Sequence, residues 1–489
     1  MVGLWIVSPS VLHHQDGAAF VAKGWFGSSW DLALAWLVPP GAVPRRADLA
    51  APGRGAELGF GPIRSSMTPS PGQVVAVAPS AVGVSEALEE VVHFGATLMR
   101  AGDTAFRVRE WMGTVASRLG LEQLSVHLAL GTVSASARRG DERATVVLEI
   151  APPGVNAWRI GALEALAREP DLRTKEVLAE RLAEIEAAPP LYSIARTSAA
   201  IGLGCGSFAF LNGGGVLEMV TAGLAGGIGQ GLRSKLLGRR FNQHAAAALS
   251  AVAAAGIYCL ISIAALHLGL GIVRYAAGLV SSVLFLVPGF PLVAALLDLL
   301  QHQAAAALTR LAYAAMLLLA AAFGLFVVSA LAGLDVTGPP SLELVAPVLL
   351  ASRALASFFG ACAFAILYNS SPRTVFAVGL LALAGNVLRL VLHDAGLIMA
   401  SATFLGALAV GLLASLARRW IAEPRIALTV PGIIMMVPGF YSFQAIVLFA
   451  RGELVPALQA AVQVGFVVGA MAMGLAAARY ISQREWLGE

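Results

Sequence analysis

The segments FLVPGFPLVAALLD (residues 285–298) and MMVPGFYSFQAI (residues 435–446) each carry the tetrapeptide Val-Pro-Gly-Phe within a long apolar run. Proline removes a backbone N–H donor and clashes with the preceding helical turn, and glycine permits non-helical backbone angles. The two prolines, Pro288 and Pro438, lie 438 − 288 = 150 residues apart. The sequence therefore predicts two apolar helices that are broken at equivalent points.

The composition is typical of a membrane protein with many spans. Of the 489 residues, 58% are hydrophobic and 13% are charged, and the mean hydropathy is +0.77. Soluble globular chains carry about 45–50% apolar and about 25% charged residues. The net charge of +4 does not indicate a nucleic-acid partner, because the basic residues form short clusters between apolar runs, as topology signals do. The three cysteines lack metal-binding spacing, and we expect neither a metal nor a cofactor.

The chain divides into an N-terminal extension, a soluble domain and a membrane domain. Residues 1–82 are rich in Pro, Gly and Trp without a lasting period, which predicts a disordered extension; the alternative is a start codon assigned too early. Residues 83–190 combine helical spacing of apolar residues with the alternating strands LSVHLALG and ATVVLEI. The fold class that we predict is a small cytosolic α+β domain followed by an all-α polytopic membrane domain.

From residue 197 the chain is a series of apolar segments. A membrane span requires about 20 mainly apolar residues. The 150-residue offset maps the third run onto the eighth, and Arg239 onto Arg389. These correspondences predict two five-helix repeats, at 197–333 and 344–482. Because five is odd, the second copy would enter the membrane from the opposite side, as in the inverted repeats of secondary transporters. The ten spans that we assign lie at 197–216, 218–234, 246–268, 275–300, 311–333, 344–368, 374–392, 396–416, 426–449 and 455–478.

Lysine and arginine are concentrated on one side of these spans. The cluster of Arg233, Lys235, Arg239 and Arg240 lies on that side, whereas the opposite side holds few basic residues. Basic residues in short loops mark the cytoplasmic side of a membrane protein. We therefore expect both termini and the soluble domain to lie in the cytoplasm.

The two breaks are the first candidates for a substrate site. Lipid offers no partner for the backbone groups that a break releases, so a break must face protein or a water-filled cavity. A half-helix that begins there directs its N–H groups and the positive end of its dipole toward an anion. The segment TVPGIIMMVPGF adds Pro431, seven residues before Pro438, and doubles the second break. The alternative is a plain proline kink that neighbouring helices relieve.

Charged residues within the apolar runs are the second group of candidates, because a charge at the membrane centre costs about 2.5–3.5 kcal/mol. Arg353 lies close to the centre of its span, where it could hold a substrate carboxylate or pair with Asp298 or Glu218. Asp298 and Glu218 could bind an ammonium group or carry a coupling proton, or be a solvated acid and a loop acid. Arg389 could be an interfacial anchor. The candidate substrate-binding residues are Glu218, Pro288, Gly289, Phe290, Pro291, Asp298, Arg353, Arg389, Pro431, Gly432, Pro438 and Gly439.

In the soluble domain, the charged segment AGDTAFRVRE (residues 101–110) has two interpretations. It could line a vestibule on the cytoplasmic side of the membrane domain. The favoured interpretation is a plain amphipathic helix face, with Arg107, Arg109 and Glu110 in water.

Several segments together resemble the threonine/serine exporter family. The segments at 93–121 and 154–166 (GVNAWRIGALEAL) are similar to the family's N-terminal domain, and VPGFPLVAALLDLL (287–300) is similar to the end of its first membrane half. The segment at 402–440 resembles the second half. The resemblance implies proton-driven export of threonine and serine across a bacterial inner membrane by a multi-pass protein. The positions that it carries over are Pro288, Gly289, Pro291, Asp298, Arg310, Arg389, Pro431, Gly432, Pro438 and Gly439.

The leading interpretation is a proton-coupled secondary transporter that exports a small amino acid by alternating access around the two broken helices. The amino acid would place its carboxylate at the half-helix N-termini and its ammonium group at Asp298 or Glu218. The alternative is a dicarboxylate exporter with Arg353 and Arg389 as critical groups, because split two-chain relatives of the family are associated with succinate export. No HExxH or GxSxG motif indicates an enzyme. The expected partners are the substrate, protons and the lipid bilayer, and the chain could form a homo-oligomer.

Overall fold

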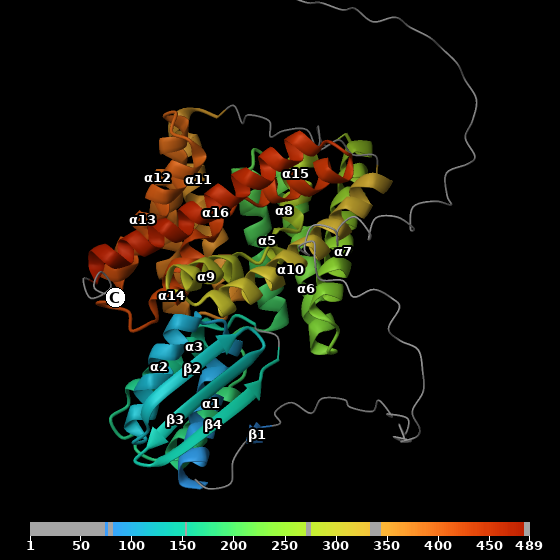
Figure 1. Cartoon of the computed structure of the whole chain (residues 1–489). Coiled ribbons are helices and arrows are strands. Elements are labelled where there is room, and N and C mark those ends of the chain that lie inside the picture. The colour runs from blue at the N-terminus through green and yellow to red at the C-terminus, as the bar shows by residue number, and fades with distance from the viewer. Residues whose placement is uncertain (1–73, 77–81, 152–153, 270–274, 333–343, 484–489) are drawn as a thin grey trace, which may run out of the picture. The chain divides into compact units, whose positions relative to one another are not determined.

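The structure is a computed structural model, and its described residues belong to one compact unit, Pro69–Glu489. The described residues are 74–76, 82–151, 154–269, 275–332 and 344–483. The predicted disordered extension, residues 1–82, lies outside them apart from 74–76 and Val82. The described chain is mainly helical, with one antiparallel sheet near its N-terminal end (Figure 1).

The first eight elements form what we call the α+β segment. Its sheet has the strand order β1-β4-β3-β2, and every neighbouring pair is antiparallel. Helix α1 packs against β3 and β4 (Figure 1). The elements are β1 (Val74–Ala76), α1 (Val82–Ala101), α2 (Ala105–Arg118), β2 (Glu122–Ala129), β3 (Thr132–Arg139), β4 (Glu142–Glu149), α3 (Ala157–Arg168) and α4 (Lys175–Ala187).

Alternation along the strands buries one face of this sheet. Val133 pairs with Leu148 and Ala135 pairs with Val146 across β3 and β4, and all four side chains are buried. Their neighbours along each strand point away from the core, because successive side chains in a strand face opposite sides. The apolar face of α1, which includes the fully buried Leu88, closes the core on the other side.

His93 on α1 links this helix to α4 through ion pairs. Its Nε2 atom lies 3.4 Å from Glu186, and its Nδ1 atom lies 3.9 Å from Glu90. The hydrogen bond to Glu186 raises the pKa of His93 from its ordinary 6.5 to about 9. The same bond lowers the pKa of Glu186 from 4.5 to about 2. The histidine contribution to stability is therefore complete below pH 6.5 and lost as the pH rises through 9, and the glutamate contribution is complete above pH 4.5 and lost as the pH falls through 2.

We expect His93→Gln to destabilise the chain most between pH 4.5 and 6.5 and to have little effect well above pH 9. The His93 side chain is 42% exposed, so solvent screening limits the effect to the range of surface ion pairs, about 0.2–1 kcal/mol. Thermal unfolding of the variant and the parent protein in detergent, measured across this pH range, checks the prediction. A stability difference that is constant with pH would contradict it.

The remaining elements are helices, and among the described residues seven of them are long and apolar enough to cross a membrane. The elements are α5 (Ile194–Leu211), α6 (Val216–Gly238), α7 (Gln243–His267), α8 (Tyr275–Ser282), η1 (Leu284–Leu286), α9 (Gly289–Leu300), α10 (Ala304–Leu331), α11 (Ala346–Leu367), α12 (Pro372–Asp394), α13 (Met399–Ala417), α14 (Arg425–Ile433), η2 (Ile434–Met436), α15 (Gly439–Ala450) and α16 (Leu454–Ser482).

The structure supports fewer spans than the ten that the sequence predicts. The bent pair of α14 with η2 and α15, whose two parts meet at 54°, raises the count among the described residues from seven to eight. Helix α6 falls short because it is rich in glycine and carries Glu218, Arg233 and Lys235. The first broken helix falls short because α8 and α9 are short separate pieces. The chain is a multi-pass membrane protein, and its described residues hold seven to eight candidate spans.

Both breaks have the same backbone geometry. Each consists of a 3₁₀ turn, a valine, a proline and a new helix. Pro288 has φ −79° and ψ 57°, and Pro438 has φ −80° and ψ 59°. These are the angles of an inverse γ-turn. In each turn the glycine N–H donates to the valine carbonyl two residues earlier, at 2.8 Å. The helices are thus broken where the two Pro-Gly pairs stand.

Pro431 does not produce a second break, contrary to the prediction. It lies inside α14, which continues to Ile433. The proline lacks one donor and crowds the preceding turn, but α14 continues through it to Ile433 and passes directly into η2. The neighbouring Gly432 instead allows close packing, since a Cβ atom there would lie 3.1 Å from Cγ1 of Val410 on α13.

Candidate functional site

The two breaks pack against each other at their glycines. A Cβ atom added at Gly289 would overlap Cδ1 of Ile434 in η2, and one added at Gly439 would overlap Cδ1 of Leu284 in η1. The contacts are reciprocal, because 439 − 289 = 150 and 434 − 284 = 150. Both breaks therefore face protein, and glycine suits these positions because it has no Cβ to occupy the narrow space between them.

The two broken helices run in opposite directions relative to the α+β segment. Helix α9 ends close to it, because Asp298 accepts a hydrogen bond from the N–H of Ala105. Helix α14 begins close to it, because a Cβ atom at Gly161 on α3 would lie 2.9 Å from Glu423 and 3.3 Å from Pro424. The chain therefore approaches the α+β segment along α8 and α9 and leaves it along α14 and α15.

The first turn of α9 has few N–H groups left for an anion. The N–H of Gly289 closes the γ-turn, and the N–H of Leu292 donates to the carbonyl of Pro288 at 3.0 Å. Pro291 has no N–H. An anion near this helix start therefore depends mainly on side chains.

A cavity of about 170 Å³ lies between the first break and the α+β segment. We call it the break cavity. Three of the candidate residues, Pro288, Phe290 and Pro291, line it. The lining also includes two arginines, Arg233 and Arg310, and two tyrosines, Tyr313 and Tyr368. The cavity thus offers guanidinium groups and aromatic rings to a small solute.

Arg233 belongs to the basic cluster that was expected to mark the cytoplasmic side of the membrane. The structure places it in the lining of the break cavity. Counted from the start of its helix, Arg233 on α6 stands at the same position as Arg389 on α12. Helices α6 and α12 begin at 216 and 372, and 372 − 216 = 156 equals 389 − 233. Counted in this way, Arg389 falls with Arg233 and not with Arg239, which is an exposed residue at the end of α6. Aligning the two predicted halves at the starts of these two helices would identify Arg233 from the sequence.

Arg389 on α12 reaches the second break. Its Nη1 atom donates to the carbonyl of Met436, the last residue of η2, at 3.4 Å. A partner of this kind is what a broken helix needs inside a membrane, where water does not reach the released carbonyl. The Nε atom of Arg389 is buried and has no hydrogen-bond partner among the described residues. Arg389 therefore contacts the second break.

Asp298 and Arg310 are buried together and hold the start of α2. Oδ1 of Asp298 accepts from the N–H of Ala105 at 2.7 Å, and its Oδ2 lies 3.7 Å from Nε of Arg310. Arg310 donates to the carbonyls of Gly102 at 3.2 Å and Asp103 at 2.8 Å. A carboxylate at a helix N-terminus satisfies the first N–H groups and the positive end of the dipole. Asp298 is therefore bound to the α+β segment, not solvated at the end of its helix.

Arg353 and Glu218 have local partners. Arg353 forms an ion pair with Asp394, whose side chain is 51% exposed, and not with Asp298 or Glu218. It lies 353 − 346 = 7 residues after the start of the 22-residue helix α11, about one turn before the middle, where the sequence places it. Glu218 is 2% exposed and accepts a hydrogen bond from the N–H of Gly215 at 2.7 Å. Glu218 is therefore a buried capping residue of α6, not a loop acid.

The charged segment at residues 101–110 only partly faces water. Arg107 is 7% exposed and forms ion pairs with Asp103 and Glu164. Burial alone would lower the pKa of Arg107, but these two carboxylates outweigh it and raise the pKa, so the guanidinium stays charged. Arg109 and Glu110 are exposed. The expected amphipathic face is thus wrong for Arg107.

Two family models match this chain. Both describe threonine/serine exporters, and they match residues 89–332 and residues 353–481. The apolar helices and these matches define a multi-pass membrane protein of the transporter class, which is not a class of enzymes. The chain belongs to the threonine/serine exporter family.

A curated relative covers a smaller part of the chain. An uncharacterized protein of Haemophilus influenzae (strain ATCC 51907 / DSM 11121 / KW20 / Rd) is 29% identical over 125 residues. The match covers 24% of this chain and 42% of the relative, so this chain spans less than half of the relative's length. No solved structure matches this chain.

Proposed function

We propose that this chain is a secondary transporter that exports threonine, serine or a similarly small amino acid from the cytoplasm. The observation that carries the proposal is the reciprocal packing of the two breaks at Gly289 and Gly439. Contacts that repeat with the two partners exchanged are typical of a two-fold axis. Together with the opposite directions of the broken helices, they support an inverted repeat of five-helix units at 197–333 and 344–482.

An inverted repeat supports alternating access, because the two halves can exchange conformations and open the same site to either side. Beside the crossing of the breaks the cavity is small and apolar, about 30 Å³, whereas the break cavity of about 170 Å³ adjoins the α+β segment. We infer that the break cavity is open to the cytoplasm in this state. The packed crossing of the two breaks then closes the path to the opposite side. The α+β segment and both termini are then cytoplasmic, in a bacterial inner membrane.

Arg233 is the residue that we assign to the substrate carboxylate. A guanidinium binds a carboxylate through two parallel N–H bonds. The ammonium group would lie against the aromatic faces of Phe290, Tyr313 and Tyr368, which line the same cavity and attract cations. This arrangement recognises a short zwitterion by its two charged groups and leaves little room for a long side chain.

Asp298 is the residue that we assign to proton coupling, with Glu218 as the second candidate. Oδ2 of Asp298 is buried and has no hydrogen-bond partner among the described residues. A proton on this atom would remove the negative charge that faces Arg310 and caps α2. Arg310 also holds Gly102, and both residues line the break cavity. Protonation would therefore loosen the wall of the break cavity, which links proton binding to its opening.

Counterflow into proteoliposomes tests the function and the site together. Vesicles are loaded with unlabelled threonine, serine, alanine or succinate, and the uptake of labelled threonine is measured for the parent protein and for Arg233→Gln. We expect threonine and serine to drive uptake, and Arg233→Gln to reduce it about 10-fold or more, because a charge-assisted hydrogen bond contributes about 1.5–3 kcal/mol.

Arg239→Gln is the matched control, because Arg239 lies on the same helix but is exposed. It should change uptake less than twofold. Equal losses of threonine uptake in the two variants would show that the break cavity is not the substrate site. Uptake of labelled succinate into succinate-loaded vesicles, with no uptake of labelled threonine into threonine-loaded vesicles, would identify a dicarboxylate exporter instead. Cross-linking in the same vesicles tests for a homo-oligomer.

A further inference from the structure

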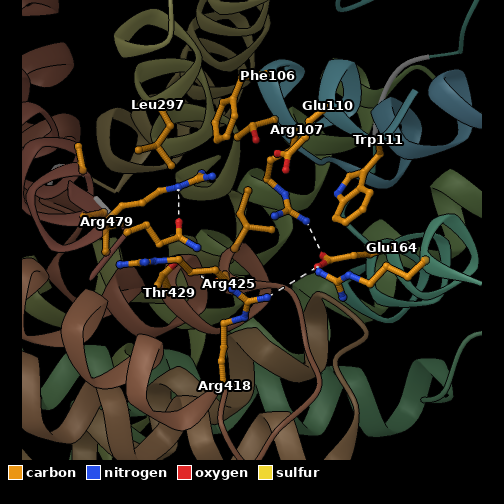
Figure 2. Close-up of a pocket in the computed structure, with 16 residues that line it drawn as sticks. Phe106, Arg107, Glu110, Trp111, Glu164, Leu297, Arg418, Arg425, Thr429 and Arg479 are labelled. Atoms are coloured by element: carbon orange, nitrogen blue, oxygen red, sulfur yellow. Dashed lines mark hydrogen bonds and ion pairs between the residues drawn. The ribbon is translucent and has the colours of Figure 1, made fainter. Parts of the chain in front are cut away.

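A second cavity, of about 140 Å³, lies where α2 and α3 of the α+β segment meet α14 and α16 of the second membrane half (Figure 2). We call it the arginine cavity. Among the described residues, none lines both this cavity and the break cavity. Apart from Leu297 of α9, the membrane side of the arginine cavity comes from the second half. The arginine cavity is therefore a separate feature that the transport proposal does not use.

The lining of the arginine cavity carries more positive than negative charge. Two glutamates line it, Glu110 and Glu164, and Asp103 pairs with Arg107 beside it. Among the described residues this leaves an excess of 5 − 3 = 2 positive charges. Burial lowers the pKa of Arg418, and the nearby charges of Arg107 and Arg168 lower it further against the opposing effect of Glu164. The arginines that line the cavity are Arg107, Arg168, Arg418, Arg425 and Arg479.

Arg425 is the buried charge that the protein does not balance. Its side chain donates to the carbonyl of Gly411 at 3.1 Å and to Oγ of Ser482 at 2.8 Å, and both acceptors are neutral. Arg425 is only 9% exposed, and it forms no ion pair among the described residues. A buried charge is normally paired, because removing it from water is costly. The position therefore calls for an anion from outside the chain.

Trp111 provides an independent sign of a missing acceptor. Its side chain is 8% exposed, and its indole Nε1 has no hydrogen-bond partner among the described residues. Figure 2 shows the indole nitrogen on the edge of the ring that faces Arg107. Buried N–H groups are nearly always paired. An oxygen atom in the arginine cavity would supply the partner.

Aromatic rings hold two of the guanidinium groups in place. The guanidinium of Arg168 lies over the ring of Trp111 at 4.9 Å, and that of Arg479 lies over the ring of Phe106 at 5.0 Å. Stacking of this kind orients the planar guanidinium without using its N–H donors. Figure 2 shows Arg479 on one side of the cavity, Arg107 on the opposite side and Arg418 below. Guanidinium groups therefore border the cavity on several sides, and Arg107 and Arg418 also contact Glu164.

We propose that the arginine cavity binds a small dianion of the phosphate class, either inorganic phosphate or the phosphate group of a larger molecule. Two charges concentrated on one tetrahedral centre match an excess of two positive charges around a compact cavity. Guanidinium groups bind phosphate oxygens through paired N–H bonds. The ligand would take bonds from Arg425 and from the indole of Trp111, and so bridge α14 to α2. It would fasten the α+β segment to the second membrane half, as Asp298 and Arg310 fasten it to the first.

Thermal unfolding of the full chain in detergent tests the site, with phosphate added at constant ionic strength. The bound dianion stabilises the folded state by mass action, so the unfolding temperature should rise and saturate with phosphate. Trp111→Phe keeps the aromatic ring under Arg168 and removes only the N–H donor. We expect it to weaken phosphate binding about 10-fold. Trp158→Phe, on α3 and away from the cavity lining, is the matched control and should leave binding unchanged.

Four ligands distinguish the source of the dianion: inorganic phosphate, glycerol phosphate, phosphatidic acid in mixed micelles, and succinate. Saturable stabilisation by any phosphate compound that weakens in Trp111→Phe supports the proposal, and the compound that binds most tightly identifies the source. Equal responses of Trp111→Phe and the parent protein, no response to any phosphate compound, or tighter binding of succinate would each overturn it. Should Trp111→Phe not fold, Arg418→Gln replaces it, because the Arg418 side chain is 30% exposed and tolerates change.

Discussion

Asp298→Ala should destabilise the folded chain by about 3–5 kcal/mol, the range for removing one partner of a buried ion pair. Arg310 is 3% exposed and would keep a buried charge without its carboxylate. The N–H of Ala105 would lose its acceptor at the same time. We expect the α+β segment to detach from α9, so that urea unfolds the variant at lower concentration and a protease cuts it faster near residue 105.

Asp394→Ala is the matched control for this prediction. Asp394 also pairs with an arginine, Arg353, but the two side chains are 51% and 22% exposed. Exposed pairs contribute about 0.2–1 kcal/mol, so the control should unfold almost as the parent protein does. Equal destabilisation by the two substitutions would show that burial does not give Asp298 its importance.

Asp298→Asn separates the structural role of Asp298 from the proposed proton role. The amide oxygen can still accept from the N–H of Ala105, so the variant should fold better than Asp298→Ala. It cannot exchange a proton near neutral pH, so export driven by a pH gradient should be lost. Full gradient-driven export by Asp298→Asn in vesicles would exclude this residue as the proton carrier and leave Glu218 as the candidate.

Gly439→Val should reduce threonine counterflow more than 10-fold and lower stability by about 1–3 kcal/mol, the range for overpacking a close contact. A Cβ atom at this position already overlaps Cδ1 of Leu284 and lies 4.0 Å from Cγ2 of Val287. The two methyl groups of valine would force η1 away from the second break. Gly289→Val should act in the same way on Ile434, because the packing is reciprocal. Counterflow rates per folded protein measure the effect.

Gly465→Val and Gly256→Val are the controls for this pair. They lie in α16 and α7, and a Cβ atom at either position meets nothing within 4 Å. Both should transport at close to the parent rate. Normal transport by Gly439→Val and Gly289→Val would mean that the crossing of the breaks is passive packing, and the alternating-access proposal would then lose its main support.

The predictions from sequence were most accurate where one residue acts on its own backbone. A proline lacks a donor wherever it stands in the chain, so Pro288 and Pro438 were expected to break their helices. The structure has a break at both positions. The same reasoning failed at Pro431, where the helix accepts the loss of one hydrogen bond. The ten spans stay a prediction, because among the described residues the glycine-rich α6 and the short α8 and α9 are less apolar or less continuous than candidate spans require.

The sequence by itself determined the membrane class, the family and the sites of the two breaks, because composition and local backbone chemistry act over a few residues. Only the tertiary structure decided which charge meets which partner. Asp298 binds Ala105, 193 residues away, and Arg107 binds Glu164, 57 residues away. Arg353 took Asp394 as its partner. Such pairings depend on how distant helices pack, and no periodicity or spacing in a single sequence records that packing.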